Sequence, residues 1–150
     1  MIGFHEIISN SESQTMSMGE SIGSNISGDE IIPIIGPLGV GKSVLVRGIA
    51  RGMGYTGRVR SPSFTIERVY STPRGELHHW DLYRLEGTSE IEPLFEEIRK
   101  QNGVRVIEWG ERLDEFFSDS FPHIEMEFQI DDNSRLIKLD ERFGFELNIP

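Results

Sequence analysis

Apolar and polar residues follow two different periods along this chain, and their alternation predicts an α/β protein. Short apolar or alternating runs predict strands at 4–8, 31–35, 67–70, 76–85, 104–109, 124–130, 136–139 and 143–149. Apolar residues at helical spacing predict helices from a cap at Ser11 to about Ile26, over 43–53, over 90–101 and over 111–117. Strands that alternate with helices in this way favour a mostly parallel sheet flanked by helices.

Two stretches change that simple picture. The turn at 71–75 joins two strands directly and predicts an antiparallel hairpin, and the last three strands follow one another without a helix. We therefore expect an α/β core, with a mostly parallel sheet flanked by helices, that also carries an antiparallel hairpin and C-terminal antiparallel strands. Residues 1–150 form a single predicted domain.

Three residues disagree with their predicted elements. Gly19 and Gly23 lie inside the first helix and weaken it by up to about 1 kcal/mol each relative to alanine. Pro33 lies inside an apolar strand, although proline cannot donate to a strand ladder. Either that strand begins after Pro33, or the proline nitrogen faces an unpaired position.

Composition excludes several classes of function. The chain has no cysteine, so disulfides and thiolate metal sites are ruled out. No segment has the length and apolar character of a membrane span, and the N-terminus has no basic-then-apolar signal pattern, so a cytoplasmic location is expected. The net charge of −10 argues against broad, sequence-independent binding of nucleic acid. A local basic patch or a basic protein partner is still compatible with it.

The segment Gly36–Ser43 carries the clearest chemical signal. It matches G-x-x-x-x-G-K-[ST] at every fixed position, after an apolar strand and before a helical pattern. A glycine loop in this context turns backbone N–H groups toward phosphate oxygens, and the helix adds its N-terminal dipole. Lys42 supplies a cation for the β- and γ-phosphates, and Ser43 supplies a hydroxyl ligand for Mg²⁺. A purely structural glycine turn does not explain the lysine and the serine.

Two acids are candidates for the same site. Glu108 ends a buried strand, where phosphate-loop proteins commonly place a carboxylate beside Mg²⁺. Asp81 lies among apolar and aromatic residues and either orients the attacking water or is a buried acid paired with Arg84 or another arginine. His78 and His79 resemble metal ligands, but neighbours on a strand point to opposite faces and cannot chelate one ion well.

Hydroxyl groups after the second helix form a further candidate segment. Ser63 and Thr65 follow Pro62 and would reach a γ-phosphate or Mg²⁺ if their loop folds back. An ordinary serine-rich turn explains the same residues, and spacing alone favours that alternative.

These motifs together resemble the TsaE (YjeE) family, the bacterial ATPases of tRNA threonylcarbamoyladenosine synthesis. The resemblance rests on Gly36–Ser43, S-P-S-F-T at 61–65, H-W-D-L-Y-R at 79–84 and I-E-W at 107–109, in order and with similar spacing. The phosphate loop alone is unspecific, whereas the combination is highly specific and covers nearly the whole chain.

The resemblance implies a phosphate-loop ATPase that binds ATP and Mg²⁺ and acts with the proteins TsaD and TsaB. That pair transfers threonylcarbamoyl to adenosine 37 of tRNA, and the ATP cycle supports its turnover, so tRNA is met indirectly and no strong direct nucleic-acid binding is expected. Hydrolysis without partners should be slow. The resemblance assigns catalysis to Lys42, Asp81, Thr65 and Ser61, Mg²⁺ to Ser43 and Glu108, and nucleotide contacts to Glu12, Thr15, Leu38, Gly39, Val40, Gly41, Lys42, Ser43 and Arg135.

The chain departs from the family pattern at four positions. Pro37, Val40, Ser43 and Gly110 stand where the family usually has Asp, Ala, Thr and Pro. Ser43 keeps the hydroxyl ligand, and Val40 is tolerable because the loop acts through its backbone. Pro37 removes an N–H group and fixes φ, so its effect on the loop is open.

Two other functions fit a phosphate loop. A small-molecule kinase needs an acceptor pocket and usually an arginine-bearing lid, and the sequence shows no clear lid insertion. A nucleotide-gated binding module would bind ATP and hydrolyse it only incidentally. A GTPase fits less well, because D-x-x-G and N-K-x-D are absent from the sequence.

Overall fold

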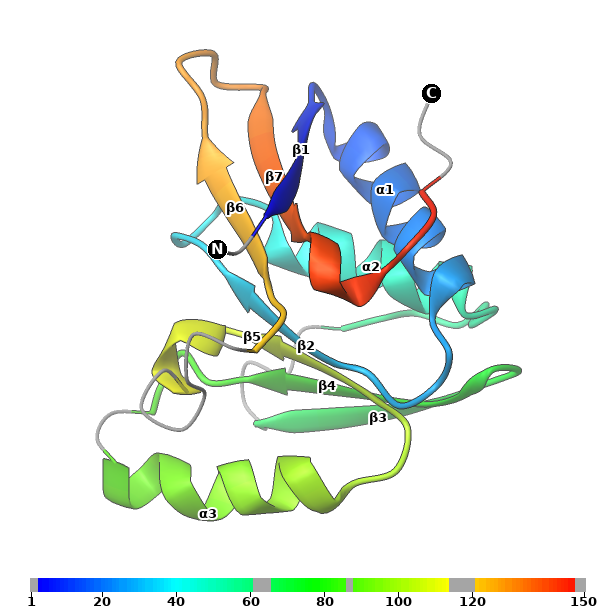
Figure 1. Cartoon of the computed structure of the whole chain (residues 1–150), viewed down its shortest axis with the longest axis vertical. Helices are drawn as coiled ribbons and strands as arrows, with labels where there is room; N and C mark the ends of the chain where they lie inside the picture. Colours follow the sequence, from blue (N-terminus) through cyan, green and yellow to red (C-terminus); the bar gives the residue numbers. More distant parts are fainter. Residues whose placement is uncertain (1–2, 61–65, 86–87, 114–120, 148–150) are drawn as a thin grey trace.

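One mixed β-sheet runs through the computed structural model, which describes residues 3–60, 66–85, 88–113 and 121–147 (Figure 1). Its strand order is β1-β7-β6-β2-β5-β4-β3. The strands are β1 (Phe4–Ser9), β2 (Ile31–Ile35), β3 (Glu67–Thr72), β4 (Gly75–Asp81), β5 (Val104–Glu108), β6 (Ile124–Phe128) and β7 (Arg135–Asp140). The helices are α1 (Glu12–Asn25), α2 (Lys42–Gly52) and α3 (Thr88–Lys100), with 3-10 turns η1 (Gly110–Leu113) and η2 (Glu141–Phe143).

The sheet has a parallel centre and two antiparallel wings, which confirms the predicted fold class. Strand β2 pairs in parallel with β5 and β6, and β5 pairs in parallel with β4. The hairpin β3–β4 forms one edge, and β6, β7 and β1 form an antiparallel arm at the other. The arm joins the centre by a short ladder in which Ile34 pairs with Ile124 and Ile35 with Glu125. Figure 1 shows the arm strongly twisted away from the central strands.

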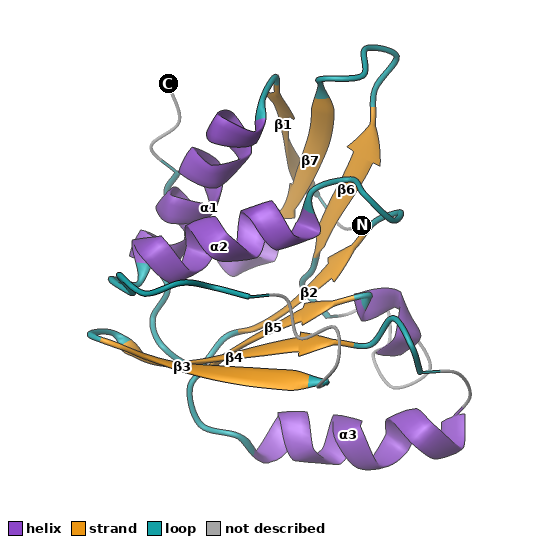
Figure 2. Ribbon diagram, turned by 180° about the vertical axis from the view of Figure 1, so that it is seen from behind, coloured by secondary structure: helices purple, strands orange, loops and turns teal. Residues whose placement is uncertain are grey.

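Two apolar clusters cover the two faces of this sheet. Helices α1 and α2 pack on one face and α3 on the other (Figure 2). Strand β5 is buried along its whole length, as expected for a strand with neighbours on both sides and helices on both faces. Its residues alternate between the clusters, with Val104 and Val106 facing α2 and Ile107 facing α3. Within the described ranges, no helix is both long enough and apolar enough for a transmembrane span.

Pro33 occupies the second of the two arrangements that its sequence position left open. The N–H of Arg105 in β5 donates to the carbonyl of Glu30 at 2.9 Å, so even-numbered residues of β2 turn their backbone groups toward β5. Pro33 therefore turns its nitrogen toward β6, whose pairing with β2 begins only at Ile34. The missing N–H costs no ladder hydrogen bond, because the strand beside it has not yet begun.

The glycines of α1 have a packing role that helix propensity does not show. A Cβ on Gly19 would lie 2.4 Å from the carbonyl oxygen of Leu45, and one on Gly23 would lie 2.2 Å from that of Ile49. On α2, added Cβ atoms at Gly48 and Gly52 would each lie 2.9 Å from a glycine Cα of α1. The two helices thus touch backbone to backbone over two successive turns. The loss of helix propensity is offset by this close contact.

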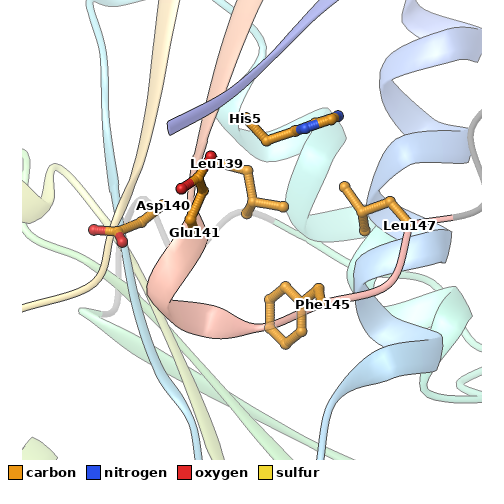
Figure 3. A pocket seen from close by; sticks show the side chains of 6 residues that line it. All are labelled: His5, Leu139, Asp140, Glu141, Phe145 and Leu147. Carbon is orange, nitrogen blue, oxygen red and sulfur yellow. The ribbon is translucent and has the colours of Figure 1, made fainter. Parts of the chain in front are cut away.

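The chain after β7 corrects one prediction, because residues 143–147 do not form a strand. Phe143 ends η2, and Gly144 turns the chain with φ of 68°. The sheet edge beside β7 is already occupied by β1, which pairs with it from Phe4 to Ser9. Phe145 and Leu147 instead face Leu139 across a pocket of about 180 Å³ (Figure 3).

The predicted helix over 111–117 is also revised. The structure has the 3-10 turn η1 from Gly110 to Leu113, and the remaining positions lie outside the described residues.

Candidate functional site

The loop between β2 and α2 has the backbone shape of a phosphate cradle. Gly39 and Gly41 have φ of 80° and 113°, which L side chains rarely adopt. The N–H of Val40 donates to the carbonyl of Pro37 at 3.3 Å. The loop therefore closes on itself through Pro37, the residue whose effect on the loop the sequence left open. Helix α2 begins at Lys42, and its first N–H groups lack partners within the helix. This end of α2 suits an anion.

The half-buried Ser43 and the buried Glu108 and His79 form a hydrogen-bonded group beside that loop. The hydroxyl of Ser43 donates to the Glu108 carboxylate, with oxygen–oxygen distances of 3.1 and 3.2 Å. Nε2 of His79 lies 2.5 Å from Oε2 of Glu108. Since an ionised carboxylate only accepts, Nε2 carries the donated proton. The histidine is fully buried and Glu108 is 3% exposed, so the carboxylate has a fixed orientation.

Strand pairing explains why the acids meet at α2. Asp81 at the end of β4 pairs directly with Glu108 at the end of β5. Side chains two residues apart share a face of a strand, so His79 and Asp81 lie on the same side of β4. The predicted meeting of Ser43, Asp81 and Glu108 at the carboxyl end of the parallel strands therefore has a simple geometric basis.

Asp81 is held in a partly buried position. Its Oδ1 accepts a hydrogen bond from the N–H of Tyr83 at 3.0 Å. Burial raises the pKa of the Asp81 carboxyl, and the negative charge of Glu108 raises it further, while the Tyr83 N–H and the charges of His79 and Lys42 act in the opposite direction. The net upward shift makes this carboxylate a stronger proton acceptor than an exposed aspartate.

Lys42 is folded back onto its own loop. Its Nζ donates to the carbonyl of Gly36 and lies 3.4 Å from that of Pro37. The same ammonium lies 3.7 Å from the ring centroid of Trp109, which has φ of 61°. Burial lowers the pKa of Lys42, although nearby carboxylates, chiefly Glu111, oppose the shift. The Lys42 ammonium thus has a resting position formed by carbonyls and an aromatic face.

Arg135 contacts the phosphate loop, and the start of α1 contacts the end of β1. Nε of Arg135 donates to the carbonyl of Val40 at 3.0 Å, which places this arginine against the phosphate loop. Thr15 is buried, and its hydroxyl lies 2.7 Å from that of Ser9. Glu12 is exposed in the first turn of α1, and Leu38 is 68% exposed at the tip of the loop. Of these predicted nucleotide contacts outside the loop, Arg135 touches the loop, and Thr15 contacts the end of β1.

The described residues fit a magnesium nucleotide. Mg²⁺ takes oxygen ligands and is usually bound by one or two protein groups together with phosphates and water. Ser43 and Glu108 offer that pair, and an added Cβ at Gly39 would meet no heavy atom within 4 Å, so the cradle is open there. No group of three or more His, Asp or Glu residues that could by itself hold a metal ion occurs among the described residues. Ser61 and Thr65 lie outside these ranges, so their assignments stay predictions.

The sequence did not predict the contacts that His79 and Trp109 make in this site. His79 was considered only as a metal ligand, yet it contacts Glu108. The signal was its spacing of two from Asp81, which puts both on one face. Trp109 entered the sequence analysis only as part of the I-E-W motif, and its ring packs beside the α3-side core cluster and lies against the Lys42 ammonium. Its ring is also 4.9 Å from that of Tyr83.

Comparison with known proteins decides the family. The profile described as "Threonylcarbamoyl adenosine biosynthesis protein TsaE" matches residues 9–137, which run from the last residue of β1 into β7. The chain belongs to the TsaE family. Relatives named "tRNA threonylcarbamoyladenosine biosynthesis protein TsaE" agree with this assignment. The protein of Rickettsia typhi is 33% identical over 141 residues, which cover 91% of this chain and 96% of that one. The protein of Aquifex aeolicus is 34% identical over 137 residues, covering 89% and 94%.

Coverage is shorter in the cyanobacterial TsaE proteins. The Synechocystis protein is 40% identical over 104 residues, or 66% of each chain, and the matched part of the Nostoc protein is 64% of its length. The chain thus spans just under two thirds of those relatives. A solved structure, that of Bacillus subtilis YdiB, superposes with a TM-score of 0.75 at 24% identity, covering 93% of this TsaE-family chain and 86% of YdiB. That likeness supports the fold.

Proposed function

We propose that this chain is a Mg²⁺-dependent ATPase that supports threonylcarbamoyl transfer to tRNA by a TsaD–TsaB complex. The observation that carries the proposal is the contact between the Ser43 hydroxyl and the Glu108 carboxylate, beside a glycine loop that ends in Lys42. A hydroxyl and a carboxylate at the start of a helix suit a metal ion bound to phosphates. Membership of a family described by threonylcarbamoyl adenosine biosynthesis supplies the biological setting.

The position of each site residue suggests its role in phosphoryl transfer. When bound, Mg²⁺ would supply positive charge that offsets the charge of the phosphates. Ser43 and Glu108 would hold the ion, and His79 would keep the Glu108 carboxylate oriented through its hydrogen bond. Lys42 would leave the Trp109 ring and place its ammonium against the phosphates. Asp81, whose pKa is raised by burial, would orient the attacking water and accept its proton.

Turnover is expected to depend on partners. Phosphoryl transfer is faster when an arginine stabilises charge on the transferred group. Arg112, an arginine beside Lys42, donates from Nη2 to the Tyr83 carbonyl at 3.2 Å and has its guanidinium 5.7 Å from the Trp109 ring centroid. These contacts tie Arg112 to the edge of the site. A partner arginine would complete the site, which agrees with a slow ATPase that is accelerated by TsaD and TsaB.

The test measures ATP hydrolysis with and without Mg²⁺, by the chain alone and with TsaD and TsaB. Ser43→Ala removes the hydroxyl ligand, and Asp81→Asn removes the base while its amide oxygen still accepts from Tyr83. Both should lose at least about tenfold in rate, as expected for a lost metal ligand or general base. Ser17→Ala, at an exposed position of α1, is the matched control and should hydrolyse ATP at the wild-type rate.

Specific outcomes would contradict the proposal. Hydrolysis by Ser43→Ala at the wild-type rate would remove the role of the Ser43–Glu108 pair. ADP release that requires an added metabolite would favour a small-molecule kinase. An Asp81→Asn chain that no longer hydrolyses ATP but fully supports tRNA modification would favour a nucleotide-gated binding module.

A further inference from the structure

Four arginines line a groove on the second half of α2. Arg47 and Arg51 are one helical turn apart on α2, so their side chains lie on the same side of the helix. Arg58 and Arg60 lie on the loop that follows, and Figure 2 shows this loop doubling back along α2. All four side chains border one depression of about 700 Å³, together with Thr56, Gly57 and Val59.

The loop that forms one wall of this groove is fixed to the sheet. The hydroxyl of Tyr70, in β3, donates to the carbonyl of Arg60 and accepts from its N–H, each at 3.0 Å. The ring of Tyr70 packs edge-on against Tyr55 with centroids 4.9 Å apart. These contacts hold the loop backbone in place beside α2. The groove therefore exists before any ligand arrives.

The charge of the groove is unusual for this chain. The whole sequence has 15 basic and 25 acidic residues. Some cations elsewhere in the described structure are ion-paired, such as Arg99 with Glu96 and Lys138 with Glu127. The four groove guanidinium groups make no ion pair or side-chain hydrogen bond with another described residue. A concave surface with four cations that form ion pairs with no described residue concentrates positive potential in an otherwise acidic molecule.

We propose that this groove binds the sugar–phosphate backbone of an RNA. Guanidinium groups present planar donor pairs that match phosphate oxygens. The described residues that line the groove include no aromatic side chain, so bases have no ring on which to stack and recognition is of the backbone. Four cations make few phosphate contacts, and the net charge of −10 opposes them, so binding is weak and strongly dependent on salt.

The groove alone does not distinguish RNA from other polyanions. The choice of RNA rests on the proposed function, which places this chain beside a tRNA. The groove is separate from the nucleotide site. Helix α2 has 11 residues and is about 16 Å long, with Lys42 at its first position and Arg51 near its last. An RNA strand in the groove would thus lie along the helix whose other end carries the phosphate loop.

The experiment measures binding of a fluorescein-labelled, unmodified tRNA transcript by anisotropy at several salt concentrations. Arg51→Gln/Arg58→Gln removes one cation from each wall. Arg99→Gln/Lys100→Gln removes two exposed cations from the end of α3 and is the charge-matched control. We expect the groove variant to bind about tenfold or more weakly at low salt, and its slope of log affinity against log salt to fall by about 1.5. The control should stay within about twofold of wild type, because non-contacting charges act only through the screened field.

Each other result overturns the proposal. No tRNA binding by the wild-type chain at low salt, an unchanged groove variant, or equal losses in both variants would show that the groove does not hold RNA. Loss of affinity for TsaD–TsaB with unchanged tRNA binding would assign the groove to an acidic protein surface. ATP hydrolysis and thermal unfolding are measured on the same variants and should be unchanged, so a failed ATPase proposal is distinguishable from a failed groove.

Discussion

The contact between α1 and α2 predicts that a helix-favouring substitution will destabilise the protein. In an exposed helix, Gly→Ala stabilises by about 1 kcal/mol. At Gly48 the new Cβ would lie 2.3 Å from the carbonyl oxygen of Met16 and 2.9 Å from the Cα of Gly19. Both opposing atoms belong to the backbone of α1, so no side chain can rotate away. The helices must separate by about 1 Å to restore ordinary van der Waals contact.

The magnitude follows from these two opposing effects. Overpacking typically costs about 1–3 kcal/mol, and a clash with backbone belongs at the upper end of that range. After the gain in helix propensity, we expect Gly48→Ala to lower the free energy of unfolding by about 2 kcal/mol. For a chain of 150 residues this corresponds to a fall in Tm of about 4–8 °C.

Urea and thermal unfolding followed by circular dichroism measure this change. Ser17→Ala, which also places alanine on these helices but at an exposed position, should raise stability by at most about 0.5 kcal/mol. A rise in Tm for Gly48→Ala would show that the helices are not in backbone contact, and the reasoning would then fail. Thr15, a predicted nucleotide contact, lies on α1, which the substitution displaces. The variant should therefore bind ATP more weakly even where it remains folded.

Three further predictions concern charged and aromatic groups. Because the folded pKa of Asp81 is raised above 3.8, Asp81→Asn should stabilise the chain above that folded pKa, and the gain should vanish as pH falls toward 3.8; urea unfolding at pH 7.5 and 4.0 measures this, and equal effects at both would refute it. Arg105 is 4% exposed and donates to four backbone carbonyls, so Arg105→Met should cost about 3 kcal/mol in urea unfolding, and a cost below about 1 kcal/mol would contradict this structural role. Binding of ATP should move Lys42 off Trp109 and change tryptophan emission; the change should persist in Trp80→Phe and disappear in Trp109→Phe, and the reverse pattern would count against the resting contact.

The fold was largely predictable because its main signals are local. Apolar runs and helical periods gave β1, β2, α2 and β5, and the motif at Gly36–Ser43 fixed where the phosphate loop lies. The position of Glu108 beside the phosphate loop could be predicted because the apolar run of β5 ends in this acid.

The remaining features depend on pairing between distant segments. The hydrogen bond from His79 to Glu108 requires that β4 and β5 be neighbours in a known register. The alternation at 143–147 was misread because a period of two does not reveal whether a sheet edge is free, and β1 had taken that edge. The packing role of Gly19 and Gly48 is visible only in the structure, where α1 and α2 are in contact. Helix propensity describes each helix by itself and does not include that contact.

The antiparallel arm is joined to the central sheet by the short ladder between β2 and β6. This ladder has two residue pairs, the fewest of any ladder among the described strands, so backbone hydrogen bonds transmit little force from the arm to the central sheet. The arm reaches the phosphate loop through the apolar core and through the Arg135 guanidinium on the Val40 carbonyl. A displacement of β1, on the outer edge, therefore reaches the loop through the apolar core and through that guanidinium. The far edge of the sheet is mechanically connected to the nucleotide loop without any residue of β1 touching it.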